Sequence, residues 1–393
     1  MSQTHEGYLL IADITGYTQY LNESELEHAH ETLAALLELL VENTRPPLVI
    51  SRLAGDAVIS YCFRENFSQG QTFVEKIEDT YVTFRKTLER LVLNNTCRCN
   101  ACANISSLDL KFFIHYGAFA IQHISDHDEL VGRDINLVHR LLKNSVPETT
   151  GFRAYALYTI EAIRQLNVAD LEETLASHSE TYEHLGEVKV LVQDMHPIWA
   201  EKRGKTIVEF PAERTWGRFE FDLEIPLEPA WDYLISPRYR TILTNSDRME
   251  IANRSHGRIA QGSVYQCYHG DSMAPQTILE WQPFEFMLLR EMLHARVPDV
   301  YAISEYRLST IEGGTRLAFR ISRPYGPFLQ GMLPLLLTPV FARVVKQGLK
   351  AFSEAIEKDY RARRSPAESP AEITGEQIEA AAAAGLEEAA NSD

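Results

Sequence analysis

The chain has 393 residues, of which 45% are hydrophobic and 24% are charged, a composition typical of a folded protein with apolar material for more than one core. Its formal net charge of −17 argues against a nucleic-acid-binding protein, which would need clustered Lys and Arg. Part of this charge is local, because residues 365–393 contain seven carboxylates and no Lys or Arg.

Membrane insertion and secretion are also not expected. The most apolar run, residues 332–345, contains two prolines and an arginine and is too short to span a bilayer. The N-terminus lacks the basic and apolar regions of a secretory signal. We therefore expect a cytoplasmic protein with reduced cysteines, no membrane span and no nucleic-acid partner.

Strand and helix patterns alternate in the N-terminal half. In chain order, we expect a buried strand at residues 8–13, a helix at 25–42, a hairpin of strands at 48–53 and 57–63, a helix at 73–93, a strand at 108–121 that is broken at Gly117, and a helix at 134–143. Residues 152–195 add one helix and a final strand. This order predicts an α/β layer of helices on a mixed sheet.

The pattern changes after a charged linker at residues 197–213. We then expect a strand at residues 216–225, a short helix at 228–235, strands at 263–268, 277–281, 287–293, 302–308 and 315–321, and a long helix at 328–360. Such an order predicts an α+β domain over residues 214–362, with a curved sheet wrapped on one helix. The Ala- and Glu-rich tail, residues 363–393, is expected to be disordered.

Two aspartates stand at turns of the first predicted domain, residues 1–196. Asp13 ends a strand directly before a glycine turn, and Asp56 follows Gly55 in the hairpin. If the two strands are neighbours, both carboxylates project from the same sheet edge. Mg²⁺ prefers hard oxygen ligands and takes one or two protein carboxylates together with a phosphate. A pair of such ions activates a hydroxyl and neutralises a leaving pyrophosphate.

Asn136 and Arg140 lie four residues apart and so share one face of a predicted helix. An amide and a guanidinium can orient a ribose and stabilise charge on a phosphate. Taken singly, these signals are weak. A lone Asp after a strand usually forms a turn, and polar residues at this helical spacing usually form a solvated face.

Four segments in order, ADITGYTQYL, RLAGDAVISY, FFIHYGAFA and ELVGRDINLVHRLL, resemble the motifs of class III nucleotidyl cyclases, the adenylate and guanylate cyclase catalytic domain. The resemblance covers residues 7–195 and implies a ferredoxin-like domain. It implies that Asp13, Asp56 and the backbone carbonyl of Ile14 bind two Mg²⁺ or Mn²⁺ ions. The phosphates would lie on the turn formed by Thr15, Gly16, Tyr17 and Thr18.

The same resemblance implies that Asn136 orients the ribose of a nucleoside triphosphate and that Arg140 stabilises the transition state. Both would act across a head-to-tail homodimer, opposite the aspartates of the other subunit. The base-reading positions differ from the family pattern. Arg52 replaces the lysine of adenylate cyclases and Glu129 replaces their aspartate, whereas guanylate cyclases usually have Glu and Cys there. We expect ATP as the substrate.

Three cysteines, Cys97, Cys99 and Cys102, are closely spaced in a polar loop outside these motifs. Thiolates at this spacing can bind one structural Zn²⁺, which needs a fourth ligand. Cys62, His115 or a residue of a partner subunit would supply it. The alternative is a loop with free thiols.

Residues 214–362 resemble the START-like, helix-grip (SRPBCC) superfamily through RFEFDLEIPLEPAWDYLISP and the long last helix. Such domains enclose an apolar cavity, which implies a hydrophobic small molecule or lipid as a regulatory ligand. The candidate lining residues are Trp281, Phe286, Tyr306, Phe319 and Phe341, although ordinary core packing is the favoured interpretation for each.

Three functions remain open from the sequence. The first is an active nucleotidyl cyclase. The second is a cyclase-homology module that binds nucleotide or only dimerises and reports the state of the START-like domain. The third is a carrier of a hydrophobic ligand in which the N-terminal half serves for dimerisation.

Overall fold

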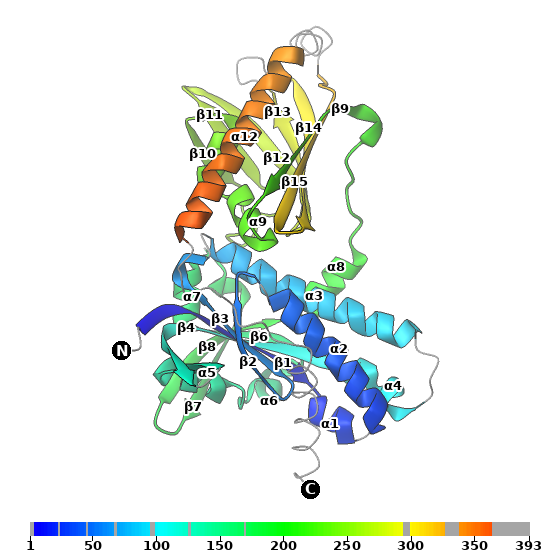
Figure 1. The fold of residues 1–393 in the computed structure, drawn as a ribbon, viewed down its shortest axis with the longest axis vertical. Helices are drawn as coiled ribbons and strands as arrows, with labels where there is room; N and C mark the ends of the chain where they lie inside the picture. Colours follow the sequence, from blue (N-terminus) through cyan, green and yellow to red (C-terminus); the bar gives the residue numbers. More distant parts are fainter. Residues whose placement is uncertain are drawn as a thin grey trace.

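The computed structural model describes residues 4–22, 24–44, 46–66, 69–94, 99–124, 127–168, 170–293, 299–326 and 338–363. They form two β-sheets, each with its own helices and its own buried core, one above the other in Figure 1. The long helix α3 (Gly70–Asn94) lies across the lower unit, on the side that faces the upper one.

The first sheet has the strand order β2-β3-β1-β4-β6-β8-β7, and β5 pairs with β4 off this path. Its strands are β1 (Thr4–Thr15), β2 (Val49–Ala54), β3 (Ala57–Phe63), β4 (Asp109–Ile124), β5 (His127–Val131), β6 (Tyr155–Thr159), β7 (Ala176–Tyr182) and β8 (Gly186–Asp194). The pair β4–β6 is parallel, and the other pairs are antiparallel.

Both faces of this sheet are covered, so β1 is apolar throughout its central part. Leu10 and Ala12 belong to the core under α2, α3 and α7, whereas Leu9 and Ile11 belong to the opposite core under α5. The helices are α1 (Tyr17–Asn22), α2 (Leu26–Thr44), α3, α4 (Asn100–Asn104), α5 (Arg133–Leu141), α6 (Val146–Thr150), α7 (Ile160–Leu166) and α8 (His196–Gly204).

The second sheet is antiparallel, with the order β10-β11-β12-β13-β14-β15-β9. Its strands are β9 (Thr215–Leu223), β10 (Arg248–Ala252), β11 (Val264–His269), β12 (Ser272–Gln282), β13 (Phe286–Met292), β14 (Tyr301–Ile311) and β15 (Gly314–Ser322). Helices α9 (Leu227–Ile235), α10 (Pro237–Thr244) and α12 (Thr338–Arg363) accompany it, and α12 crosses the sheet diagonally in Figure 1.

A cavity of about 1220 Å³ lies between this sheet, α10 and α12. Its walls combine apolar side chains, such as Phe319 and Leu349, with the polar Gln276 and Glu291. Beside it, the fully buried Arg240 donates to Gln276 Oε1 at 2.8 Å. The cavity is therefore amphipathic rather than purely apolar.

Helix α3 joins the two units through a buried polar cluster. The Glu75 carboxylate accepts hydrogen bonds from the indole N–H groups of Trp231 at 3.0 Å and Trp281 at 2.8 Å, and from Gln71 at 2.8 Å. Burial raises the pKa of Glu75 to about 7, although these hydrogen bonds favour its charged form.

Further contacts surround this carboxylate. Lys76 forms a buried ion pair with Glu228, and Arg258 donates to both carboxylate oxygens of Glu78 at 2.9 Å. Gln71 exchanges two hydrogen bonds of 2.7 Å with the backbone of Ile259. A single helix therefore carries most of the polar contacts that tie one unit to the other.

The mixed α/β class expected from the sequence is confirmed, and most expected strands and helices are present. Several expectations need correction. β4 continues through Gly117 without a break, and the expected linker contains α8. The sequence patterns also did not predict α1, α4, β5, α6, β6 and β7 in the first unit or α10 and β10 in the second. Residues 328–337 and most of the expected disordered tail, residues 364–393, lie outside the described residues.

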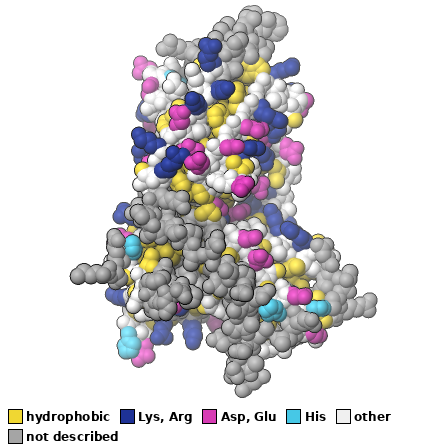
Figure 2. Space-filling view, viewed as in Figure 1, with side chains coloured by type: hydrophobic (Ala, Val, Ile, Leu, Met, Phe, Trp, Pro, Cys, Tyr) yellow, Lys and Arg dark blue, Asp and Glu magenta, His cyan; other side chains and the backbone are white. Residues whose placement is uncertain are grey.

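No helix within the described ranges has the combination of length and hydropathy that a bilayer crossing requires. On the face shown in Figure 2, the described Lys and Arg side chains of the upper unit are interspersed with Asp and Glu.

We expect Glu75→Gln to flatten the pH dependence of stability. The folded-state pKa of about 7 lies above that of an unfolded Glu, about 4.3, so the wild-type protein loses stability as the pH rises through this window. Glutamine does not titrate. The stability of the wild type relative to the variant should therefore fall by an amount on the order of 3 kcal/mol between about pH 4.5 and pH 8.

Urea denaturation at several pH values measures this difference. The exposed Glu187 gives a matched control. In Glu187→Gln, the free energy of unfolding should change with pH as it does in the wild type. An equal slope in the wild type and Glu75→Gln would show that the buried carboxylate does not hold its proton more tightly in the folded state.

Candidate functional site

Asp13 and Asp56 lie at the same end of the first sheet. Asp13 pairs with Ala57 across β1 and β3, which places it beside the Gly55–Asp56 turn. The backbone N–H of Ile14 donates to the carbonyl oxygen of Asp56 at 3.3 Å. Gly55 has a φ of 59°, a left-handed conformation that glycine adopts without strain, so the tight hairpin explains the Gly-Asp pair. The sheet thus brings the two predicted metal aspartates together.

A lysine neighbours Asp13 on the other side. Lys111 pairs with Asp13 across β1 and β4, and its Nζ lies 5.5 Å from the centre of the Tyr155 ring. Burial raises the pKa of Asp13, and the positive charge of Lys111 opposes this shift. The sequence analysis did not include Lys111 among the site residues, although a charged residue in an otherwise apolar strand could have indicated it.

The predicted phosphate turn follows β1 directly. Gly16 has a φ of 85°, and its carbonyl accepts from Tyr20 N at 2.9 Å, which starts α1. A Cβ on Gly16 would stand 3.3 Å from the carbonyl oxygen of Ser107, so the turn also packs against the chain before β4. Thr15 is half-buried and Thr18 is exposed. The turn therefore places backbone N–H groups beside the two aspartates.

Asn136 and Arg140 are both exposed on α5, as their spacing predicted. The opposite face of the helix buries Ile135, Val138 and Leu141 against the sheet. The helix therefore presents an amide and a guanidinium on one side while its apolar side holds it in place.

The start of α5 is fixed far from the aspartates. Asp134 accepts a hydrogen bond from Ala118 N at 2.7 Å, next to Gly117, which pairs with Gly7. Gly117 lies six positions along β4 from Lys111, which pairs with Asp13. At the rise of a β-strand, six positions correspond to about 20 Å.

Arg52 and Glu129, the predicted base-reading residues, contact each other. A guanidinium nitrogen of Arg52 lies 3.4 Å from Glu129 Oε1, and the other lies 3.4 Å from Nε2 of His139 on α5. The pair is accessible, with exposed side-chain fractions of 46% and 42%. Burial, with the nearby charge of Arg52, lowers the pKa of His139, so this imidazole is neutral at pH 7.

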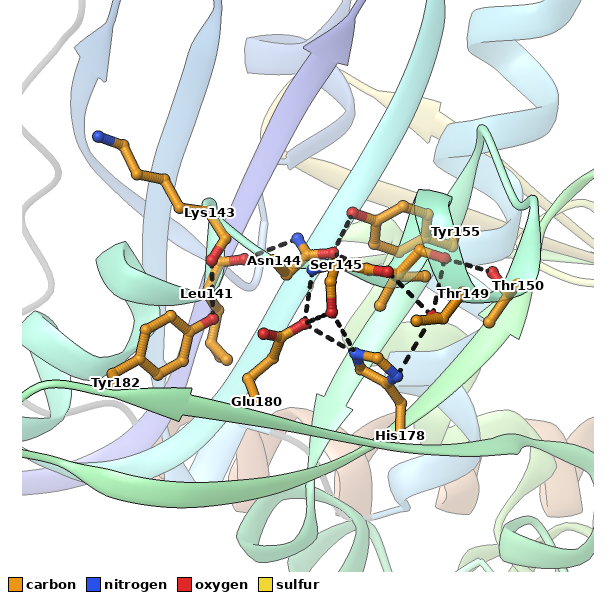
Figure 3. A network of polar contacts seen from close by, with 11 residues as sticks. Leu141, Lys143, Asn144, Ser145, Thr149, Thr150, Tyr155, His178, Glu180 and Tyr182 are labelled. Carbon is orange, nitrogen blue, oxygen red and sulfur yellow. Dashed lines mark hydrogen bonds and ion pairs between the residues drawn. The ribbon is translucent and has the colours of Figure 1, made fainter.

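A second polar cluster in this unit contains a serine, a histidine and a glutamate (Figure 3). Glu180 Oε1 accepts from Ser145 Oγ at 2.8 Å, from Ser145 N at 2.6 Å and from His178 Nε2 at 2.7 Å. In a catalytic triad, the histidine uses opposite ring nitrogens for the nucleophile and the acid. Here Ser145 and Glu180 both contact Nε2 of His178, so the cluster is a structural tie between β7 and the start of α6.

The structure also corrects the expected surroundings of the cysteine cluster and of the cavity. Cys97 lies outside the described residues, but Cys99 and Cys102 lie close to His28 of α2. Neither Cys62 nor His115 belongs to this group, because both are buried in the sheet, where His115 contacts Thr159 at 2.9 Å.

Of the expected cavity residues, Tyr306 and Phe319 line the cavity. Trp281 instead binds Glu75, and Phe286 packs against Phe210 on the outer face of the sheet. The side chain of Phe341 lies outside the described residues.

Comparison with known proteins gives partial matches. A family model described as "Protein of unknown function (DUF2652)" matches residues 33–150, less than a third of the chain. The "Uncharacterized protein Rv2561/Rv2562" of Mycobacterium tuberculosis is 26% identical over 170 residues, which cover 42% of this chain and 76% of that protein.

Solved structures match part of the chain at low identity. A bacterial light-regulated adenylyl cyclase matches with a TM-score of 0.39 and 13% identity. The match covers 50% of this chain and 56% of that protein. The adenylyl cyclase CyaB from P. aeruginosa has a TM-score of 0.36 and 14% identity over 49% of this chain and 96% of that one. Protein CV1439 from Chromobacterium violaceum has a TM-score of 0.28 and 14% identity over 37% of this chain and 98% of its own.

We expect Asp134→Ala to destabilise the protein by about 1–2 kcal/mol, because it removes the hydrogen bond to Ala118 N and a negative charge from the first turn of α5. Chemical denaturation measures the change. Glu187→Ala, at an exposed carboxylate of β8, should stay within about 0.5 kcal/mol of the wild type. Equal effects of the two variants would mean that Asp134 does not anchor α5.

Proposed function

We propose that this protein is a class III nucleotidyl cyclase, which converts a nucleoside triphosphate, expected to be ATP, into a 3′,5′-cyclic nucleotide and pyrophosphate. The observation that carries this proposal is the placement of Asp13 and Asp56 at one sheet end, beside the exposed turn after β1. The order β2-β3-β1-β4, with α2 and α3 on one face, supports a ferredoxin-like βαββαβ unit.

The donor set at this sheet end fits Mg²⁺ or Mn²⁺. Asp13, Asp56 and the Ile14 carbonyl offer hard oxygen ligands, and two carboxylates are as many as Mg²⁺ usually takes from a protein. Burial raises the pKa of Asp13, so its ionised form gains from a further positive charge beside Lys111. Two bound ions supply activation of the ribose 3′-hydroxyl and charge neutralisation on the pyrophosphate.

The residues of the chain hold the nucleotide. The backbone N–H groups of the turn from Thr15 to Thr18 bind phosphate oxygens beside the aspartates. The ring closes when the 3′-hydroxyl gives its proton to water, its oxygen bonds to the α-phosphorus, and the bond from that phosphorus to the bridging oxygen breaks to release pyrophosphate. Asn136 orients the ribose for this displacement, and Arg140 stabilises the charge that grows on the phosphate oxygens.

Two copies of the chain complete each site. As the resemblance implies, one copy supplies the aspartates and the other supplies Asn136 and Arg140. The start of α5, about 20 Å along β4 from Asp13, is compatible with this division. A symmetric head-to-tail homodimer forms two such sites.

Arg52 and Glu129 recognise the base from the same copy as α5, since Arg52 also contacts His139 of that helix. For adenine, Glu129 accepts from the exocyclic amine, and Arg52 donates to a ring nitrogen. To bind the base in this way, Arg52 exchanges its contact with Glu129 for contacts with the nucleotide.

We further infer two domains, residues 1–196 and 214–362, joined by residues 197–213, with the second built as a START-like helix grip. The order of one strand, two helices, an antiparallel meander and a long last helix supports this inference. The cavity beside Arg240 and Glu291 would take a hydrophobic small molecule or lipid with one polar group. Its occupancy would reach the cyclase domain through α9 and α3.

One observation favours a second function, a cyclase-homology module that binds nucleotide or only dimerises. Arg52 and Glu129 are paired with each other, and Arg52 stands where adenylate cyclases have lysine. A module of this kind would keep the dimer and the link through α3 but would show no turnover.

The deciding experiment incubates the purified full-length protein with Mn²⁺ and each of the four nucleoside triphosphates and reads the products by mass spectrometry. We expect a cyclic nucleotide from ATP. Asp13→Ala and Asp56→Ala should each lower turnover at least about a thousandfold, equivalent to about 4 kcal/mol, because each removes a metal ligand. Asp271→Ala, at an exposed carboxylate of the second domain, should keep wild-type activity. Nucleotide binding without turnover of any triphosphate would support the module instead.

Mixing two inactive variants tests the shared site. Asp56→Ala and Arg140→Ala homodimers should each be inactive, whereas a mixed dimer has one site with both lesions and one intact site. Activity should recover to about a quarter of the wild type when subunits exchange freely, because half of the dimers are mixed and half of their sites are intact. No recovery after verified exchange would place the catalytic residues within one chain.

A further inference from the structure

A group of soft metal ligands lies apart from the two aspartates. His28 is in the first turn of α2, and Cys99 and Cys102 flank the start of α4. Their ligand atoms all lie within 4.8 Å of one another. His28 Nδ1 is 3.2 Å from Cys99 Sγ and 3.8 Å from Cys102 Sγ.

These distances match tetrahedral coordination. With Zn–S bonds of about 2.3 Å and Zn–N bonds of about 2.0 Å, the sulfur and nitrogen atoms of one site lie about 3.6 Å apart. The two observed distances from His28 Nδ1 lie on either side of that value. An ion bound between the three atoms therefore requires only small movements of the side chains.

The backbone prepares this site. Cys99 is the N-cap of α4, and its sulfur accepts from Cys102 N at 3.4 Å, which fixes the sulfur at the start of the helix. Glu25, just before α2, accepts from Ala101 N at 3.0 Å, which holds the two helix starts together. All three ligands are half-buried, so an ion can enter from the solvent.

We propose that His28, Cys99 and Cys102 bind one Zn²⁺, as a structural site separate from the two aspartates proposed to hold Mg²⁺ or Mn²⁺. Two thiolates and an imidazole are soft to intermediate ligands, which suit zinc and disfavour Mg²⁺ and Ca²⁺. In structural zinc sites a fourth ligand closes the tetrahedron. Cys97 lies outside the described residues, so the site is defined by the other three.

The ion stabilises the segment that supports the turn after Asp13. From α4 the chain continues to Ser107, whose carbonyl oxygen faces Gly16 and accepts from Arg153 at 3.2 Å. Thr15 in turn donates to the Arg153 carbonyl at 3.4 Å. Zinc would hold α2 and α4 together behind this turn and so fix its position.

The test begins with full-length protein purified without added metal. Elemental analysis should find about one Zn per chain, a chelator should lower the melting temperature, and added Zn²⁺ should restore it. Co²⁺ in place of zinc should give the thiolate charge-transfer and tetrahedral ligand-field absorption bands of a site with two sulfur ligands.

Variants separate loss of the site from loss of the fold. His28→Ala and Cys99→Ser should lose the metal, whereas His28→Cys, which keeps a soft ligand at the same position, should retain it. His30→Ala is the matched control, because His30 lies on the same helix and is also half-buried but does not belong to the group. It should keep one Zn per chain.

Two results would overturn the site. One is wild-type protein that contains no zinc, takes up no Co²⁺ and has Cys99 and Cys102 as reactive thiols or as a disulfide. The other is a folded His28→Ala protein that keeps a full equivalent of zinc. Neither result bears on the proposed cyclase activity, which is measured separately by product formation from nucleoside triphosphates.

Discussion

The buried Glu75 carboxylate lies where the two sheets meet through one helix, and it takes its hydrogen bonds from both sides of that junction. Gln71 donates from α3 itself, while the indoles of Trp231 and Trp281 donate from the second unit. A buried carboxyl without such donors would cost several kcal/mol, so the position of α9 and β12 relative to α3 is tightly constrained. The opposite face of α3, from Phe73 to Leu88, fills the core of the first sheet.

Helix α3 contacts elements next to the candidate site on one side and elements next to the cavity on the other. Helix α3 contacts the segment before β4, and that segment packs against the turn that follows Asp13. On its other side, α3 contacts α9, which packs in the same core as the strands around the cavity. If the cavity binds a ligand as proposed, α3 is the element through which that ligand would act on the sheet end that carries Asp13 and Asp56.

The sequence predicted best the parts whose signals are local. The apolar run before Asp13 and the Gly55–Asp56 turn define β1 and the β2–β3 hairpin by themselves, and the spacing of Asn136 and Arg140 gives their shared face. β7 was missed because its sequence, ASHSETY, alternates without strongly apolar residues, as befits the edge strand of its sheet.

What the sequence did not reveal depends on segments far apart in the chain. His28 precedes Cys99 by 71 residues and has no local feature that marks it as a ligand. Glu75 lies on a helix rich in charged residues, and nothing near it in the sequence indicates that a second sheet will cover it. Arg52 and Glu129 were paired only by their shared role in the resemblance, and their contact joins β2 to β5, which pair with β3 and β4 respectively.

A contact of Asp232 with α3 limits how the two units can be exchanged in evolution. Its carboxylate accepts from Gln69 N at 3.2 Å and from Thr72 Oγ1 at 2.7 Å, so a residue of the second unit caps the first turn of α3. A recombination event that exchanged the second unit would leave this helix start without its acceptor, unless the incoming domain placed a carboxylate or hydroxyl at the same point. The two halves are therefore expected to be inherited together and to diverge as a matched pair.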